Sequence, residues 1–213
     1  VGRARCPDGR GGSRADRGRP RAALGDHGAV HRAGARDHGH GGVIRQETIA
    51  REQGGMDFQW ATQQEDRTRL WQARHDAYPA CRRLMPGSRS MSTDVCVPIS
   101  RLAECVVETQ KDVQATGLIA PIVGHVGDGN FHLTLLCDMD STQEVETCRA
   151  FLHRLVERSL AMEGTCTGEH GVGQEKMKYL LKEHPAATLD TMRAIKQALD
   201  PQNIMNPGKI VAV

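Results

Sequence analysis

The sequence predicts an α+β fold in which an antiparallel sheet carries helices on one face, in a ferredoxin-like arrangement, with further helices at the C-terminal end. Two observations support this prediction. The apolar, β-branched-rich runs LIAPIVGHV and NFHLTLLCD flank Gly127-Asp128-Gly129, which is a strong hairpin signal. Segments with apolar residues at helical spacing precede and follow the two runs.

Composition narrows the possible classes of function. The 213 residues carry a net charge of only +2, so there is no global electrostatic case for binding nucleic acid or a membrane surface. No apolar run approaches the roughly 20 residues of a transmembrane helix. The 7 cysteines include no Cys-x-x-Cys pair, which favours reduced thiols over a disulfide framework.

Residues 1–42 differ from the rest of the chain. They lack aromatic residues, contain almost no Leu, Ile or Val, and show no helix or strand period, so we expect this segment to be disordered. Three interpretations compete: a basic nucleic-acid-binding tail, a mitochondrial transit peptide, and a GC-rich coding region read in the wrong frame. The Arg/Gly/Ala/Pro/His mixture favours the third.

From Val43 onward the sequence predicts a series of regular elements. Helices are expected over 43–55, 62–84, 100–117, 141–164, about 172–183 and about 187–199. The second should break near Pro79, and Ser100 should open the third, which Gly117 ends. Within SMSTDVCVPIS, Val95 and Val97 alternate with polar neighbours, as in a half-buried strand.

The hairpin places two histidines on either side of its turn. His125 and His132 would point to opposite faces of one straight strand, but a reversal at Gly-Asp-Gly lets them sit across from each other. Both could then bind one metal ion. The pair is also compatible with two structural histidines that flank a turn.

A glycine-rich loop adds a carboxylate to this picture. GTCTGEHGVG, residues 164–173, holds Glu169 and His170 where packing does not need them. Two histidines and a carboxylate form a three-ligand set with open positions, suited to zinc, manganese or iron. A nucleotide-binding loop fits poorly because the spacing is not G-x-G-x-x-G, and an iron oxygenase fits poorly because its ligand order differs.

A third feature is the helical segment RLWQARHDAY. An arginine on a packed helix can hold a substrate carboxylate through two hydrogen bonds, and Arg67, Arg69 and Arg74 are all candidates. A solvated helix face explains any one of them equally simply.

Three separated motifs resemble a known family in order and spacing. GHVGDGNFH, GTCTGEHGVG followed by Lys176, and ALDPQNIMNPGK resemble the C-terminal domain of FAD-linked oxidases, in the vanillyl-alcohol-oxidase superfamily. RLWQARHDAY and STDVCVPISRL are similar to its mitochondrial-type D-lactate dehydrogenase branch. The resemblance covers about residues 43–213.

The resemblance implies roles for individual residues. His125, His132 and Glu169 would be the ligands of a divalent metal, with zinc or manganese expected. His170 would be the general base, Arg74 would meet the substrate carboxylate, and Asn206 would lie near the flavin ring. The implied reaction is oxidation of a D-2-hydroxy acid to the 2-oxo acid with hydride transfer to FAD.

The resemblance also implies what lies outside these residues. The family binds FAD mainly in a separate N-terminal domain, for which residues 1–42 have the wrong composition, so we expect a substrate-and-metal cap without its flavin domain and with little turnover alone. The alternative is a non-catalytic metal-binding fragment. The implied partners are a small 2-hydroxy acid and an electron-acceptor protein or quinone, and the implied location is the mitochondrion.

Overall fold

The computed structural model describes residues 40–55 and 58–213, and the chain divides into two units after Trp60. The first unit contributes helix α1 (His40–Glu52), which is followed by Gly54 in the left-handed region, in line with the predicted stop at Gly54-Gly55. This helix begins three residues before the expected boundary at Val43. The remainder of the 1–42 segment lies outside the described residues.

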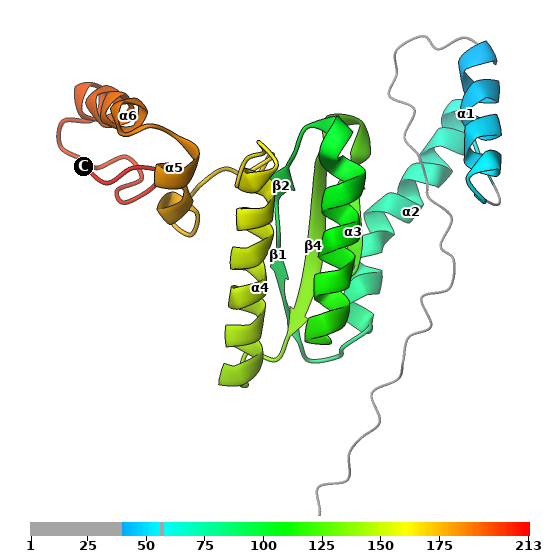
Figure 1. The fold of residues 1–213 in the computed structure, drawn as a ribbon, viewed down its shortest axis with the longest axis horizontal. Helices are drawn as coiled ribbons and strands as arrows, with labels where there is room; N and C mark the ends of the chain where they lie inside the picture. The colour runs from blue at the N-terminus through cyan, green and yellow to red at the C-terminus, as the bar shows by residue number, and fades with distance from the viewer. Residues whose placement is uncertain (1–39, 56–57) are drawn as a thin grey trace, which may run out of the picture. The chain divides into compact units, whose positions relative to one another are not determined.

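The second unit, residues 61–213, is an antiparallel sheet with helices, and it confirms the predicted α+β class (Figure 1). Its elements in chain order are listed by their bounds: α2 (Gln64–Arg83), β1 (Arg89–Ser92), β2 (Val95–Cys96), α3 (Ile99–Thr116), β3 (Ile122–His125), β4 (Asn130–Cys137), α4 (Thr142–Ala161), α5 (Met177–Glu183) and α6 (Ala186–Leu199).

Strand β4 is the centre of the sheet, because the other three strands all pair with it in antiparallel fashion. β3 joins β4 through a short 3-10 turn over Val126–Asp128, so the predicted hairpin is confirmed. β1 and β2 pair with β4 in one register, Ser92 opposite Thr134 and Val95 opposite Phe131. They therefore form a single strand interrupted at Thr93 and Asp94.

The two faces of β4 carry different kinds of side chain. Every residue of the strand is buried, and side chains alternate between faces along a strand. One face packs its apolar side chains into the core with α3 and α4: Phe131, Leu133, Leu135 and Cys137. The two helices lie side by side over the sheet in Figure 1. The other face carries Asn130, His132, Thr134 and Leu136.

The two covering helices form because each has an apolar face at helical spacing. On α4, Cys148, Phe151 and Leu155 are fully buried, and the Ser141 hydroxyl caps the helix by accepting from the backbone N–H of Glu144. On α3, Leu102 and Cys105 are buried, and Gly117 ends the helix in the left-handed region, as predicted.

Three local predictions were wrong. Helix α2 continues through Pro79 to Arg83, since loss of one backbone N–H leaves the flanking turns bonded. Helix α3 begins after Pro98, and Ser100 provides no side-chain cap. The helix expected from 172 starts only at Met177, because the preceding residues form a loop with Gly171 and Gly173 in the left-handed region.

Three further observations concern the described part of the chain. Its six cysteines are all free thiols, in line with the sequence. No helix among the described residues is both long enough and apolar enough to cross a bilayer. At the C-terminal end, α5 and α6 share a small second core of Leu180, Leu189 and Val211.

An ion-pair clamp joins α3 to α4. Asp112 on α3 accepts from Arg154 at 2.7 Å and from Arg158 at 2.9 Å, and its side chain is only 12% exposed. Burial alone would raise the pKa of Asp112, but the hydrogen bonds and charges of the two arginines outweigh it and hold that pKa below its ordinary value.

We expect Asp112→Asn to lower the free energy of unfolding by about 2 kcal/mol at neutral pH. Because the folded pKa is depressed, this contribution is present above the unfolded pKa of about 3.9 and disappears as pH falls through the folded value. Urea unfolding of both proteins across this pH range should show the gap closing on the acid side. Asp66→Asn, which removes an exposed i,i+3 pair with Arg69, is the control and should change little. A gap that persists below the folded pKa would contradict the assignment.

The hairpin turn offers a second test. Gly129 has φ +73°, and a Cβ there would lie 2.1 Å from the Val97 carbonyl oxygen, whereas a Cβ at Gly127 would meet nothing within 4 Å. We therefore expect Gly129→Ala to destabilise the fold by about 2–4 kcal/mol and Gly127→Ala by less than about 0.5 kcal/mol. Chemical denaturation of the two variants measures the difference, and equal effects would refute the steric argument.

Candidate metal and substrate site

The predicted metal ligands come from two segments of the chain. His132 lies on β4, on the face opposite the apolar core, and His125 is the last residue of β3, across the hairpin. Glu169 lies in the loop between α4 and α5. The structure brings all three together, with one ligand atom from each within 4.8 Å of the others.

The carboxylate of Glu169 lies between the two imidazoles. Its Oε1 is 3.0 Å from His132 Nε2 and 3.6 Å from His125 Nε2. The two rings stand edge to face with their centroids 5.9 Å apart. The His132 side chain is 8% exposed, but that of Glu169 is 50% exposed, so the cluster is closed on the sheet side and open on the other.

His132 is held in one tautomer. Its Nδ1 lies 3.0 Å from the Thr93 carbonyl oxygen, which accepts only if Nδ1 carries the proton. In the neutral ring the lone pair is then on Nε2, which is buried, makes no hydrogen bond and lies 3.0 Å from Glu169 Oε1. A lone pair that faces a carboxylate oxygen at this distance suits a cation bound by both atoms.

The spacing of these atoms suits a divalent ion. Ligand atoms about 2.1 Å from a zinc ion stand about 3.0–3.4 Å apart at octahedral or tetrahedral angles. The separations of 3.0 and 3.6 Å at Glu169 are close to this range. Two neutral imidazoles and one carboxylate also match the donor preferences of zinc and manganese. The residues present therefore fit a divalent metal with open coordination positions.

His170 lies flat against His132. The two rings are stacked with centroids 4.9 Å apart and an interplanar angle of 4°. The His170 side chain is 49% exposed, and its Nε2 is 3.7 Å from Glu169 Oε1, too far for a hydrogen bond. The half-exposed ring could therefore exchange a proton with a molecule bound beside the cluster.

Asp94, which was not among the predicted site residues, holds the loop of Glu169 in place. This carboxylate is only 2% exposed, and it accepts from the backbone N–H groups of Gly168, Glu169 and His170 at 2.9–3.2 Å. It also accepts from the side chains of three residues: Asn130, Thr167 and Lys176. An acidic residue between the buried Thr93 and Val95 was the signal that could have revealed it.

The electrostatics of Asp94 follow from these contacts. Burial alone would raise the pKa of Asp94, but the hydrogen bonds from His170, Asn130, Glu169 and Thr167 outweigh it, so the pKa lies well below its ordinary value. The Lys176 ammonium, 3.2 Å away, is the neighbouring positive charge. Asp94 is thus a buried anion whose lone pairs are already taken by protein donors.

Packing around Asp94 also explains a glycine of the loop. A Cβ at Gly168 would lie 2.0 Å from the Asn130 side-chain nitrogen, which itself donates to Asp94 and to the Val95 carbonyl. Only glycine lets the loop approach the hairpin this closely.

The structure leaves two predicted residues apart from this cluster. Arg74 lies half-buried on α2, and Asn206 is exposed in the C-terminal tail with φ +47°. Among the described residues, no hydrogen bond or ion pair connects either of them to the metal ligands. Their roles toward substrate and flavin stay predictions.

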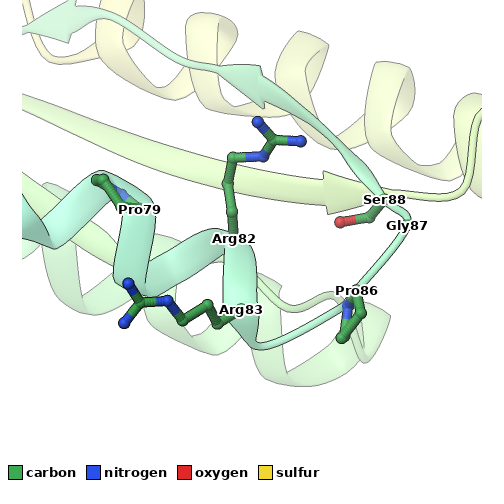
Figure 2. Close-up of a pocket in the computed structure, with 6 residues that line it drawn as sticks. All are labelled: Pro79, Arg82, Arg83, Pro86, Gly87 and Ser88. Atoms are coloured by element: carbon green, nitrogen blue, oxygen red, sulfur yellow. The ribbon is translucent and has the colours of Figure 1, made fainter.

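A shallow pocket at the C-terminal end of α2 does not contribute to the site. Figure 2 shows that the guanidinium groups of Arg82 and Arg83 point in different directions, so they do not converge on one anion. The lining consists of Pro79, Arg82, Arg83, Pro86, Gly87 and Ser88, none of which is a predicted site residue.

Comparison with known proteins finds relatives that are named as dehydrogenases. The chain is 50% identical over 165 residues to a probable mitochondrial D-lactate dehydrogenase of Danio rerio, covering 78% of this chain and 33% of that protein. It is 45% identical over 163 residues to the mitochondrial D-lactate dehydrogenase [cytochrome] of Arabidopsis thaliana, covering 76% and 29%. The chain thus spans about a third of the length of these relatives.

A solved structure shares the fold. 4-Ethylphenol oxidase from Gulosibacter chungangensis, in its isoeugenol complex, superposes with a TM-score of 0.54 at 18% identity, covering 79% of this chain and 36% of that one. The family model described as FAD linked oxidases, C-terminal domain, matches residues 33–210. With the motifs of the hairpin and the glycine loop in place, the chain belongs to the FAD-linked oxidases and contains their C-terminal domain.

Proposed function

We propose that these residues form the substrate- and metal-binding part of an FAD- and divalent-metal-dependent dehydrogenase of D-2-hydroxy acids, of the D-lactate type. The observation that carries the proposal is the convergence of His125, His132 and Glu169, with His132 Nε2 buried and free of hydrogen bonds. The names of the two relatives support the substrate class.

In this proposal a bound metal ion and FAD would supply part of the chemistry, and side chains of the protein would supply the rest. A divalent ion would polarise the 2-hydroxyl of the substrate, and FAD would accept the hydride from C2. His125, His132 and Glu169 would hold the ion. His170 Nε2 would take the hydroxyl proton, so that the hydroxy acid loses one proton and one hydride to become the 2-oxo acid.

The position of His170 suits a general base. Its ring is fixed by stacking on His132, while its Nε2 lies at the half-exposed side of the cluster. A substrate oxygen near Glu169 would therefore come within reach of this nitrogen. We assign Arg74 to the substrate carboxylate and Asn206 to the flavin ring on the family motif alone.

We propose that the full activity also needs residues outside this chain. Because the chain spans about a third of its relatives' length, we propose that FAD is bound mostly by residues outside these 213. We propose a mitochondrial location from the relatives' names, and an electron-acceptor protein or quinone as the partner that reoxidises FAD. The same short span favours one alternative, a metal-binding fragment without catalytic activity.

The metal site can be tested on the chain as it stands. We expect about one divalent ion per chain for wild type after dialysis against zinc or manganese, and almost none for His132→Ala or Glu169→Gln, because each loses one of three ligands. Elemental analysis of the dialysed proteins measures the ratio.

Matched substitutions exist for both ligands. His153→Ala changes a half-exposed histidine of α4, and Glu175→Gln changes an exposed glutamate of the same loop. Both should keep the wild-type metal content. A wild-type protein without metal, or ligand variants that keep it, would overturn the site.

The dependence on a separate flavin-binding region gives a second test. We expect the 213-residue chain to reduce a dye acceptor with D-lactate no faster than its metal-free form, even with added FAD, because hydride transfer needs FAD held at the site. Steady-state dye reduction is the measurement. A rate well above the metal-free control would show that these residues suffice for turnover.

A further inference from the structure

The sheet is interrupted at two residues, Thr93 and Asp94, beside the candidate metal site. β1 and β2 pair with β4 in the same register on either side of this break. Thr93 and Asp94 are both only 2% exposed, so the break is a buried part of the sheet rather than a surface loop.

At Thr93, the first residue of the break, the side chain makes one of the hydrogen bonds that the backbone of a regular strand would make. The Thr93 N–H donates to the Leu133 carbonyl at 3.0 Å, as a ladder residue would. The Leu133 N–H, however, donates to the Thr93 hydroxyl at 2.8 Å rather than to the Thr93 carbonyl. That carbonyl accepts from His132 Nδ1 instead. The hydroxyl thus replaces the carbonyl in the ladder and makes the carbonyl available to the histidine.

The second residue of the break turns toward the glycine loop. Asp94 accepts from three consecutive backbone N–H groups, those of Gly168, Glu169 and His170. Thr167 adds its hydroxyl at 2.9 Å. The Asp94 carboxylate therefore binds the backbone of Glu169, the proposed metal ligand, and of His170, the candidate base.

This stretch of loop has little other support. Residues 168–171 are all exposed, and Gly168 has no side chain to bury. Apolar packing therefore contributes little to its conformation, and hydrogen bonds to a buried anion are the strongest restraint on it.

We propose that the Thr93–Asp94 break sets the geometry of the metal site through its hydrogen bonds to the residues of that site. In this proposal Asp94 is a positioning residue that fixes Glu169 and His170, and the Thr93 carbonyl fixes the ring of His132. The inference rests on the proposed metal site and goes beyond its three ligands. It identifies two residues outside the three proposed ligands that determine how tightly the ion is held.

The test uses Co²⁺ as the probe on the full 213-residue chain. We expect Asp94→Asn to weaken Co²⁺ binding about 10–100-fold and to change the visible absorption of the bound ion, since the loop would no longer hold Glu169 in one position. Urea unfolding, measured in parallel, separates loss of affinity from loss of the fold.

The chain offers a close control in Asp200. This aspartate is 4% exposed, pairs with Lys196, and accepts from the backbone N–H groups of Ile204 and Met205. Asp200→Asn thus removes a similar buried carboxylate away from the metal ligands. It should lower stability without changing Co²⁺ affinity or its spectrum.

A milder variant keeps the test decisive if Asp94→Asn does not fold. Thr167→Val removes one donor to Asp94 and leaves the carboxylate and all three ligands in place, and we expect a several-fold loss of Co²⁺ affinity. Unchanged affinity in a folded Asp94→Asn, or in Thr167→Val if that is the variant that folds, would overturn the positioning role while leaving the metal site intact. A wild-type chain that does not bind Co²⁺ would overturn the metal site itself, and the inference with it.

Discussion

A buried carboxylate links the segments that form the candidate site. Asp94 lies at the break between β1 and β2, receives the Asn130 amide from the start of β4, and accepts three backbone N–H groups from the loop after α4. Lys176, just before α5, adds the compensating charge. An ionised carboxylate in such a position is tolerable only because its oxygens are hydrogen-bonded and a cation lies next to it. The loop, the hairpin and the sheet are therefore tied together at this anion.

The two faces of strand β4 contribute to different properties, one to the stability of the core and the other to the candidate site. Its apolar face forms the core with α3 and α4, where Phe131, Leu133 and Leu135 are almost fully buried. Its polar face carries His132, so this candidate ligand stands on a strand whose residues are all buried. Glu169 and His170 come instead from an exposed loop that buries little apolar surface, and that loop depends on hydrogen bonds for its position. A metal site made in this way has one fixed side and one side open to solvent, where a substrate could bind.

Local signals, and motifs that are specific although they are far apart in the sequence, gave correct predictions. The hairpin followed from Asp-Gly between two β-branched runs, and α4 followed from its apolar period. Predictions failed where tertiary contacts decided the outcome. Pro79 did not end α2, and the glycine loop extended to Lys176 because that segment folds back toward Asp94. Arg74 and Asn206 were assigned by motif, and no contact within the described residues connects them to the ligands.

The amino-acid sequence by itself determined the α+β class, the hairpin, and the residue types of the candidate metal site, because turn chemistry, periodicity and ligand chemistry are properties of short segments. The family followed from three motifs in the correct order. Only the tertiary structure decided that Glu169 lies 3.0 Å from His132 across 37 residues of chain, and that Asp94 is an anchor rather than an ordinary polar residue of a half-buried strand. The physical reason is that a buried charge is defined by the donors that surround it. The three backbone donors lie more than 70 residues from Asp94 along the chain.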